Sequence, residues 1–135
     1  MGAVTDGDVE VQAAADRLIT AFGQGQLEDY FACFADDASF IFYNTRERLE
    51  TTTAYRRLWD RWITEDDFRV TACESSAVRI QRVGDVAVFI HDVRTEVSTR
   101  AGAQTSLERE TIVFARQEDG RWLAVHEHLS PTPEA

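Results

Sequence analysis

Apolar residues in the first half of the chain recur at the spacing of a helix. Val11, Ala15, Leu18 and Phe22 fall on one face of a helix, which Gly23 and Gly25 end. A second segment has acids at its start and then a short apolar run. A third segment, which Thr51 or Thr52 would cap, has the strongest helical pattern of the chain. The predicted elements of this half are helices within residues 8–26, 26–34 and 51–66, and a short strand over residues 39–43.

In the second half the pattern changes to the alternation typical of strands. Val78 and Ile80, for example, alternate with Arg79 and Gln81. Short turn signals separate four such runs, which indicates an antiparallel meander. Helices first and sheet after is the order of an α+β domain. The runs cover residues 68–83, 86–99, 106–117 and 121–130, with turns at 83–85, 100–102 and 118–120.

The amino-acid composition of the chain disfavours some classes of binding partner. The chain has 135 residues, the size of one ordinary domain, and a formal net charge of −10. That sign disfavours nucleic acid and anionic membranes, which attract basic proteins. No run approaches the roughly 18 apolar residues of a membrane span, and the N-terminus lacks the basic and apolar regions of a signal peptide. We therefore expect a cytoplasmic protein that binds neither nucleic acid nor membrane.

The chain carries no motif for a metal or a cofactor. All 14 basic residues are Arg, which excludes a Schiff-base lysine and a phosphate-binding lysine of the P-loop type. The two cysteines, Cys33 and Cys73, stand far apart and form no C-x-x-C pair of the kind that zinc and redox sites use. We expect no cofactor.

Two segments resemble a known family. "GQGQLEDYFACFADDASFIF" (residues 23–42) is similar to a Gly-x-Leu…Phe-Ala-Asp-Asp-Ala segment of the nuclear transport factor 2-like superfamily. "RETIVFARQEDGRWLAVHEHLS" (residues 109–130) is similar to the closing hairpin of SnoaL-like domains and of the association domain of calcium/calmodulin-dependent protein kinase II. The resemblance implies one domain over residues 1–135, in which three N-terminal helices pack on a strongly curved, mostly antiparallel sheet. This cone-shaped α+β fold would enclose a pocket, and residues 1–7 and 131–135 would be flexible tails.

Strand alternation sorts the side chains of this sheet into two faces. Placing the closing hairpin on the family pattern puts Ile112, Val125 and Glu127 on the concave face, toward the pocket. The resemblance also implies a homodimer through the outer face, to which the alternation assigns Trp122, His126 and His128. A mostly apolar cleft with a few polar groups is typical of sites for small molecules. The predicted ligand-binding residues are Phe42, Tyr43, Tyr55, Trp59, Trp62, Ile90, Asp92, Arg94, Ile112 and Phe114.

Two acids of the concave face are the candidate catalytic residues. An apolar cleft would raise the pKa of Glu127 or Glu110, so that either could act as a general acid or base. Each could instead form a structural salt bridge with Arg94 or Arg109. Arg94 could also bind a ligand carboxylate through two hydrogen bonds.

The two histidines on either side of Glu127 are also open to a metal interpretation. Two imidazoles on one strand face can share an ion, but a metal site needs a third ligand, and His91 is the only other histidine. A hydrogen-bonded pair at an interface is the favoured interpretation of His126 and His128, and no metal-binding residue is predicted.

The resemblance allows one specific comparison of activity. The ketosteroid-isomerase branch of the superfamily uses a Tyr, an Asp base and a protonated acid, and the matching positions here are Leu18, Phe42 and Ile112. All three are apolar, so that proton shuttle is absent. We predict a small-molecule-binding domain whose ligand is partly apolar and could bear a carboxylate. The alternatives are a cofactor-free isomerase, lyase or dehydratase, or hydrolase that uses a pocket carboxylate as base, and an oligomerisation module.

Overall fold

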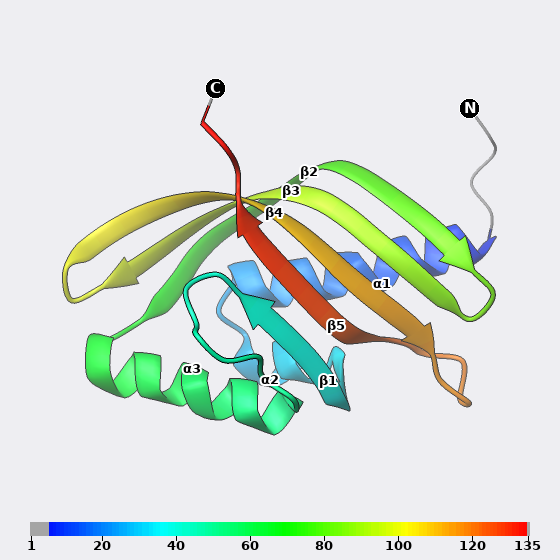
Figure 1. Cartoon of the computed structure of the whole chain (residues 1–135), viewed down its shortest axis with the longest axis horizontal. Coiled ribbons are helices and arrows are strands. Elements are labelled where there is room, and N and C mark those ends of the chain that lie inside the picture. The colour runs from blue at the N-terminus through cyan, green and yellow to red at the C-terminus, as the bar shows by residue number, and fades with distance from the viewer. Residues whose placement is uncertain (1–5, 135) are drawn as a thin grey trace.

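The α+β order predicted from the hydrophobic pattern is confirmed in the computed structural model, which describes residues 6–134 (Figure 1). The main difference lies before Ser39, where the sequence suggested a turn. There the second helix ends at Phe31, and a strand begins at Phe34 because Phe34 and Ala38 already face the core. The elements are α1 (Asp6–Gly23), α2 (Leu27–Phe31), β1 (Phe34–Phe42), α3 (Thr52–Asp66), β2 (Arg69–Val83), β3 (Val86–Thr99), β4 (Gly102–Arg116) and β5 (Trp122–Pro131).

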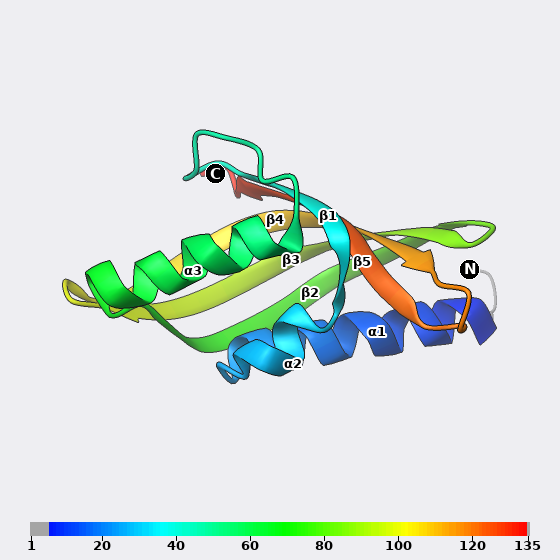
Figure 2. The same cartoon turned by 90° about the horizontal axis from the view of Figure 1, so that it is seen from below.

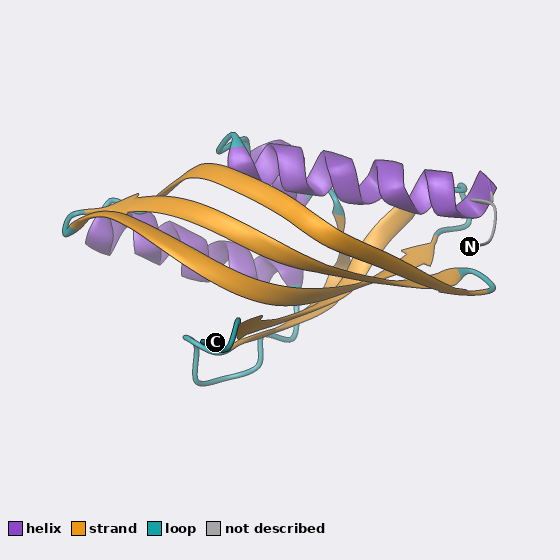
Figure 3. Cartoon of the chain, turned by 90° about the horizontal axis from the view of Figure 1, so that it is seen from above, coloured by secondary structure: helices purple, strands orange, loops and turns teal. Residues whose placement is uncertain are grey.

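The strands form one open, curved sheet in the order β1-β5-β4-β3-β2. β1 runs parallel to β5, and the other neighbouring pairs are antiparallel. The helices lie along the hollow side of this sheet (Figure 2), and Figure 3 shows the same curved layer of strands from the opposite direction. Buried residues of all three helices join the inward-facing residues of the strands in a single core. Helices and sheet thus form the predicted cone.

The turn between β3 and β4 decides which side chains of β3 face inward. It contains only residues 100 and 101, one fewer than predicted, so His91 rather than Asp92 lies opposite Glu110. Directly opposite residues share a face, and a shift of one residue therefore turns the whole strand over. The predicted concave placement of Ile90, Asp92 and Arg94 is wrong for this reason. Asp92 and Arg94 are exposed on the outer face, where Ile90 is half-buried.

A β-bulge interrupts the alternation of β5. Val125 is an extra residue without a partner on β4: before it Ala124 pairs with Phe114, and after it His126 pairs with Val113. Because a bulge places two residues of one strand opposite one residue of the other, the alternation changes phase at Val125. Residues of opposite parity before and after the bulge therefore point to the same side of the sheet.

Because of the bulge, Trp122 does not lie on the outer face, where the alternation had placed it. Its side chain is 4% exposed in the core, and its indole Nε1 donates a hydrogen bond to Glu10 Oε2 of α1 at 3.0 Å. Beyond the bulge, Glu127 faces inward as predicted, and His126 and His128 face outward. The Nδ1 atom of His126 lies 2.8 Å from the Ser39 hydroxyl of β1.

Aromatic side chains join α1, α2 and α3 to β1. Tyr30 lies at the centre of this group, with ring centroids 5.2 Å from Phe22, 5.1 Å from Phe34 and 5.5 Å from Trp59. Aromatic pairs in tilted or edge-to-face arrangements contribute about 0.5–1.5 kcal/mol each beyond their buried area. These contacts fix α3 at the distance from the sheet at which the cleft described below opens.

The two predicted tails are partly in regular structure. α1 already includes residues 6 and 7, and β5 extends to Pro131, after which the Thr132 amide donates to the Leu107 carbonyl at 2.9 Å. Residues 1–5 and 135, the rest of the predicted N-terminal tail and the end of the C-terminal one, lie outside the described structure. Within residues 6–134, the structure contains no helix with the length and apolar character needed to cross a membrane.

Replacing Trp122 tests its place in the core. Trp122→Ala should lower the free energy of unfolding by about 3–5 kcal/mol, because it leaves a cavity behind the bulge. Urea unfolding at two protein concentrations measures this loss, which should be the same at both. Ser130→Ala, an exposed position on the same strand, should change the free energy by less than about 0.5 kcal/mol. A loss that shrinks at high protein concentration would instead place Trp122 in an interface between chains.

Candidate functional site

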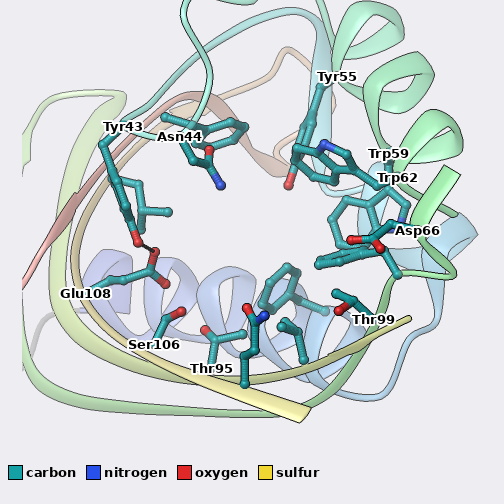
Figure 4. A pocket seen from close by; sticks show the side chains of 16 residues that line it. Tyr43, Asn44, Tyr55, Trp59, Trp62, Asp66, Thr95, Thr99, Ser106 and Glu108 are labelled. Carbon is teal, nitrogen blue, oxygen red and sulfur yellow. Dashed lines mark hydrogen bonds between the residues drawn. The ribbon is translucent and has the colours of Figure 1, made fainter. Parts of the chain in front are cut away.

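A cleft of about 300 Å³ opens between α3 and the inward face of the sheet (Figure 4). Figure 4 shows Tyr43 and Glu108 on the side of the cleft opposite Trp59, Trp62 and Asp66. Aromatic residues form the helix side, and the strand side is mainly polar. The polar residues that β3 and β4 contribute are Thr95, Thr99, Gln104, Ser106 and Glu108.

Helix α3 supplies the aromatic wall. It begins after Thr51, whose hydroxyl accepts a hydrogen bond from the Ala54 amide at 3.0 Å, as the predicted cap requires. Tyr55, Trp59 and Trp62 then follow at helical spacing and face the cleft. The ring centroids of Trp59 and Trp62 are 5.9 Å apart. Such a wall offers flat apolar surface to a ligand, so the cleft suits a molecule with an aromatic or alicyclic part.

A smaller cavity of about 60 Å³ adjoins the cleft on its inner side. Six residues line both spaces, so a ligand in the cleft can reach the cavity with a small group. The shared residues are Phe22, Phe42, Tyr55, Thr95, Glu108 and Leu129, and the inner cavity adds the polar residues Tyr30, Cys73, His91, Glu110 and Glu127.

Glu127 is a buried acid without a counter-charge. Its side chain is 2% exposed, and its Oε1 has no hydrogen-bond partner among residues 6–134. Burial raises the pKa of Glu127 well above the usual range of a glutamate, and the nearby Glu110 carboxyl raises it further. The raised pKa favours the protonated form of Glu127, which can donate a hydrogen bond or a proton into the inner cavity.

Glu108 lies at the boundary between the cleft and the inner cavity. The Tyr43 hydroxyl donates a hydrogen bond to Glu108 Oε2 at 2.6 Å. Burial raises the pKa of Glu108, the hydrogen bond from Tyr43 opposes this shift, and Glu110 adds to it. Burial, followed by this same contact, raises the pKa of Tyr43 to about 12. A carboxylate with a raised pKa is a stronger base, so Glu108 can accept a proton from a ligand in the cleft.

A third polar group links the inner cavity to the edge of the sheet. His91, 1% exposed, places Nε2 2.7 Å from Glu110 Oε1 and Nδ1 2.6 Å from the Ser75 hydroxyl. The register of β2 shifts just beyond Ser75, and Ala77 in the shifted segment has a φ of 52°. That left-handed conformation costs a non-glycine residue roughly 1–2 kcal/mol. This irregularity in β2 allows the edge strand to place Ser75 beside His91, and β2 pairs with β3 both before and after it.

Arginine does not line either space, although the chain contains 14 basic residues. Arg94, the predicted partner of a ligand carboxylate, pairs instead with Glu96 at 3.1 Å. Within residues 6–134, no ion pair joins Arg94 or Arg109 to Glu110 or Glu127. The reason for expecting a carboxylate-bearing ligand is therefore removed.

A metal site is not formed by these acids. In the part of the chain that the structure describes, no group of three His, Cys, Asp or Glu side chains is arranged to hold an ion.

The structure brings together part of the predicted site. Phe42, Tyr43, Tyr55, Trp59 and Trp62 line the cleft, and Glu110 and Glu127 line the inner cavity, where their catalytic role stays a prediction. Ile112 and Phe114 face the same side but are fully buried in the core and do not line the cleft. Ile90, Asp92 and Arg94 point away from it, as the register of β3 dictates.

Several polar residues of the site were missed in the sequence, among them Glu108, His91 and Asp66. Glu108 lies two residues before Glu110, so the alternation of β4 alone would have placed it on the same face. The inward position of His91 could be predicted only from the length of the turn after β3, which the sequence leaves ambiguous. Asp66 lies one helical turn after Trp62 on α3, and this spacing could have placed it beside the aromatic wall.

Comparisons with known proteins agree with this fold. The SnoaL-like domain family matches residues 11–134. Among curated proteins, no sequence matches the chain. A nuclear transport factor 2-like superfamily protein from Salmonella enterica serovar Typhimurium has a TM-score of 0.80 at 18% identity, covering 94% of this chain and 92% of that one.

Two further solved structures share the fold. A ketosteroid isomerase-like protein from Erwinia carotovora atroseptica has a TM-score of 0.79 at 16% identity, covering 96% of this chain and 99% of its own. A protein from Xanthomonas campestris, whose name places it with the calcium/calmodulin-dependent protein kinase II association domain, has a TM-score of 0.77 at 18% identity and covers 99% and 95%. At these identities the likeness shows the fold alone.

Glu127→Gln should flatten the pH dependence of stability. In the unfolded chain a glutamate loses its proton near pH 4.5, whereas buried Glu127 keeps it to a higher pH. The resulting stabilisation of the folded state is complete below pH 4.5 and is lost as the pH rises through the raised pKa. The free energy of unfolding of the native chain should therefore fall relative to that of Glu127→Gln between about pH 5 and pH 8.

Urea unfolding across this pH range measures the difference between the two chains. Glu118→Gln, an exposed acid in the turn before β5, should differ from the native chain by nearly the same amount at every pH. A difference between the native chain and Glu127→Gln that does not change with pH would mean that Glu127 titrates like an ordinary glutamate.

Proposed function

The chain belongs to the SnoaL-like domain family, and from that premise we propose that it binds a small, partly apolar molecule in the cleft and transfers a proton to or from it. The observation that carries the proposal is the buried Glu127, which has a raised pKa, lines the inner cavity, and has an Oε1 without a partner among the described residues. A carboxyl group in this state can act on a ligand that brings the missing hydrogen-bond partner.

Binding is supported by the shape and lining of the cleft. Its volume of about 300 Å³ is at the lower end of the range for small-molecule sites. The aromatic wall of Tyr55, Trp59 and Trp62 can pack against a planar group, while polar side chains of β3 and β4 meet the other side. A ligand held this way would extend toward Glu108 and the inner cavity.

Proton transfer is supported by two acids in different surroundings. Glu108 reaches the cleft and keeps one hydrogen bond, from Tyr43, which suits a base that meets the ligand. Glu127 lies deeper and holds its proton, which suits an acid or a hydrogen-bond donor to charge that develops on the ligand. The His91–Glu110 pair lies beside both and can exchange protons with them. Isomerisation and elimination are the reactions that such a pair of groups serves.

The base proposed for this reaction can be tested with a probe that needs only proton removal. A base that takes the ring carbon proton of 5-nitrobenzisoxazole breaks the N–O bond and releases a coloured cyanonitrophenolate. We expect the native chain to accelerate this ring opening and Glu108→Gln to lose about 100-fold of the acceleration. Glu127→Gln should retain binding and lose a smaller part of the rate, since its carboxyl meets the developing phenolate.

Glu118→Gln, which removes an exposed acid far from the cleft, is the matched control and should react like the native chain. Binding of the probe is measured separately through quenching of tryptophan fluorescence. Binding without acceleration would leave a binding protein without acid–base catalysis, and equal acceleration by the native chain and Glu108→Gln would exclude Glu108 as the base.

We further propose that a second copy of the chain covers the outer face of the sheet. The helices lie on the opposite side, and Val88, Ile90 and Val113 present half-buried apolar side chains on this face next to His126. Ile90→Arg should therefore convert a dimer to a monomer in sedimentation equilibrium, because a charge would be buried at the centre of the patch. Thr53→Arg, exposed on α3, should leave the mass unchanged, and a native chain that sediments as a monomer would contradict the proposal.

A further inference from the structure

The charges around the cleft differ from those of an ordinary surface. The chain has 14 arginines, yet the cleft and the inner cavity are lined by four acids, Asp66, Glu108, Glu110 and Glu127, and by no arginine. A negatively charged ligand entering this space would meet no arginine and would lose its hydration without compensation. A positively charged ligand could pair with the acids that reach the cleft, Asp66 and Glu108.

The aromatic wall adds a second attraction for a cation. Trp62 lies 5.3 Å from Phe68 and 5.9 Å from Trp59 between ring centroids, so the three rings form one continuous surface beside the cleft. Indole rings are the strongest partners for an ammonium group placed over their faces. Asp66 follows Trp62 by four residues on α3, so its carboxylate lies on the same side of the helix as this surface.

The carboxylate of Asp66 is available for such a ligand. Among residues 6–134 no salt bridge involves its side chain, and the hydrogen bond at Asp66 uses its backbone carbonyl, which accepts from the Arg100 amide. At the far end of the space, Oε1 of Glu127 is buried and has no hydrogen-bond partner among residues 6–134, so a polar group of a ligand could bind there. Acidic side chains therefore lie at both ends of the space, with Asp66 at the cleft and Glu127 in the inner cavity.

We infer that the molecule bound in this cleft is an amine, with its ammonium group held between Asp66 and the face of Trp62, and its apolar part directed toward Glu108. This inference rests on the proposed ligand-binding function and specifies the charge of the ligand. It replaces the expectation of a carboxylate-bearing ligand, whose recognition required Arg94 inside the pocket.

Three molecules that differ only in one terminal group test the inference. They are 4-phenylbutylamine, 4-phenylbutan-1-ol and 4-phenylbutanoate, which are a cation, a neutral molecule and an anion at neutral pH. Isothermal titration calorimetry should show the amine binding about tenfold more tightly than the alcohol, and the carboxylate more weakly than the alcohol. Asp66→Asn should remove most of the advantage of the amine and leave the affinity for the alcohol unchanged.

Asp60→Asn is the matched control, because it removes one exposed acid from the same helix without changing the cleft. Trp62→Leu gives a second, independent measurement and should weaken the amine more than the alcohol. Equal affinities of the amine and the alcohol, or an equal effect of Asp60→Asn and Asp66→Asn, would overturn the inference and leave the proposed proton transfer intact. If none of the three molecules binds, the inference and the proposed binding function are both wrong.

Discussion

The β-bulge at Val125 is the constraint on which the rest of the structure depends. Strict alternation along β5 could bury either Trp122 or Glu127, but not both. The bulge changes the phase between them, so Trp122 anchors α1 through Glu10 while Glu127 reaches the inner cavity. Because of this one extra residue, the same strand contributes to the core that holds the helices and to the site that the helices cover. Bulges next to active sites commonly redirect a side chain in this way.

The aromatic core determines the chemistry of the acids that it surrounds. Burial is the largest cause of the raised pKa of Tyr30, Tyr55 and Glu127, and the acids then raise one another's pKa further. The Tyr30 and Tyr55 hydroxyls share one hydrogen bond at 2.9 Å. A buried arginine would have made these carboxyl groups permanent anions. No arginine lines the inner cavity, so burial there favours the protonated form of Glu127, whereas the exposed Asp66 at the cleft is the acid that can pair with a cation.

Periodicity alone predicted the elements, because apolar spacing reports directly which face of a helix or strand is buried. It gave the cap at Thr51, the aromatic face of α3 and the inward position of Glu127. It did not give the phase between strands, which depends on local backbone geometry: one residue in the turn after Thr99 moved Asp92 and Arg94 out of the pocket and His91 into it. The bulge at Val125 has no glycine or proline to mark it.

A glutamate at position 127 costs local stability, and this cost favours a functional role for the side chain. Glu127 lies opposite Ile112 in a fully buried part of the sheet. An apolar side chain at this position would leave no polar atom unpaired. A carboxyl group there leaves a polar atom unpaired, at a cost of about 1–3 kcal/mol. Sites that break a rule of packing in this way are commonly the functional ones. The unpaired oxygen lines a cavity that adjoins the aromatic cleft, so a ligand group entering from the cleft can supply the hydrogen bond that the fold omits.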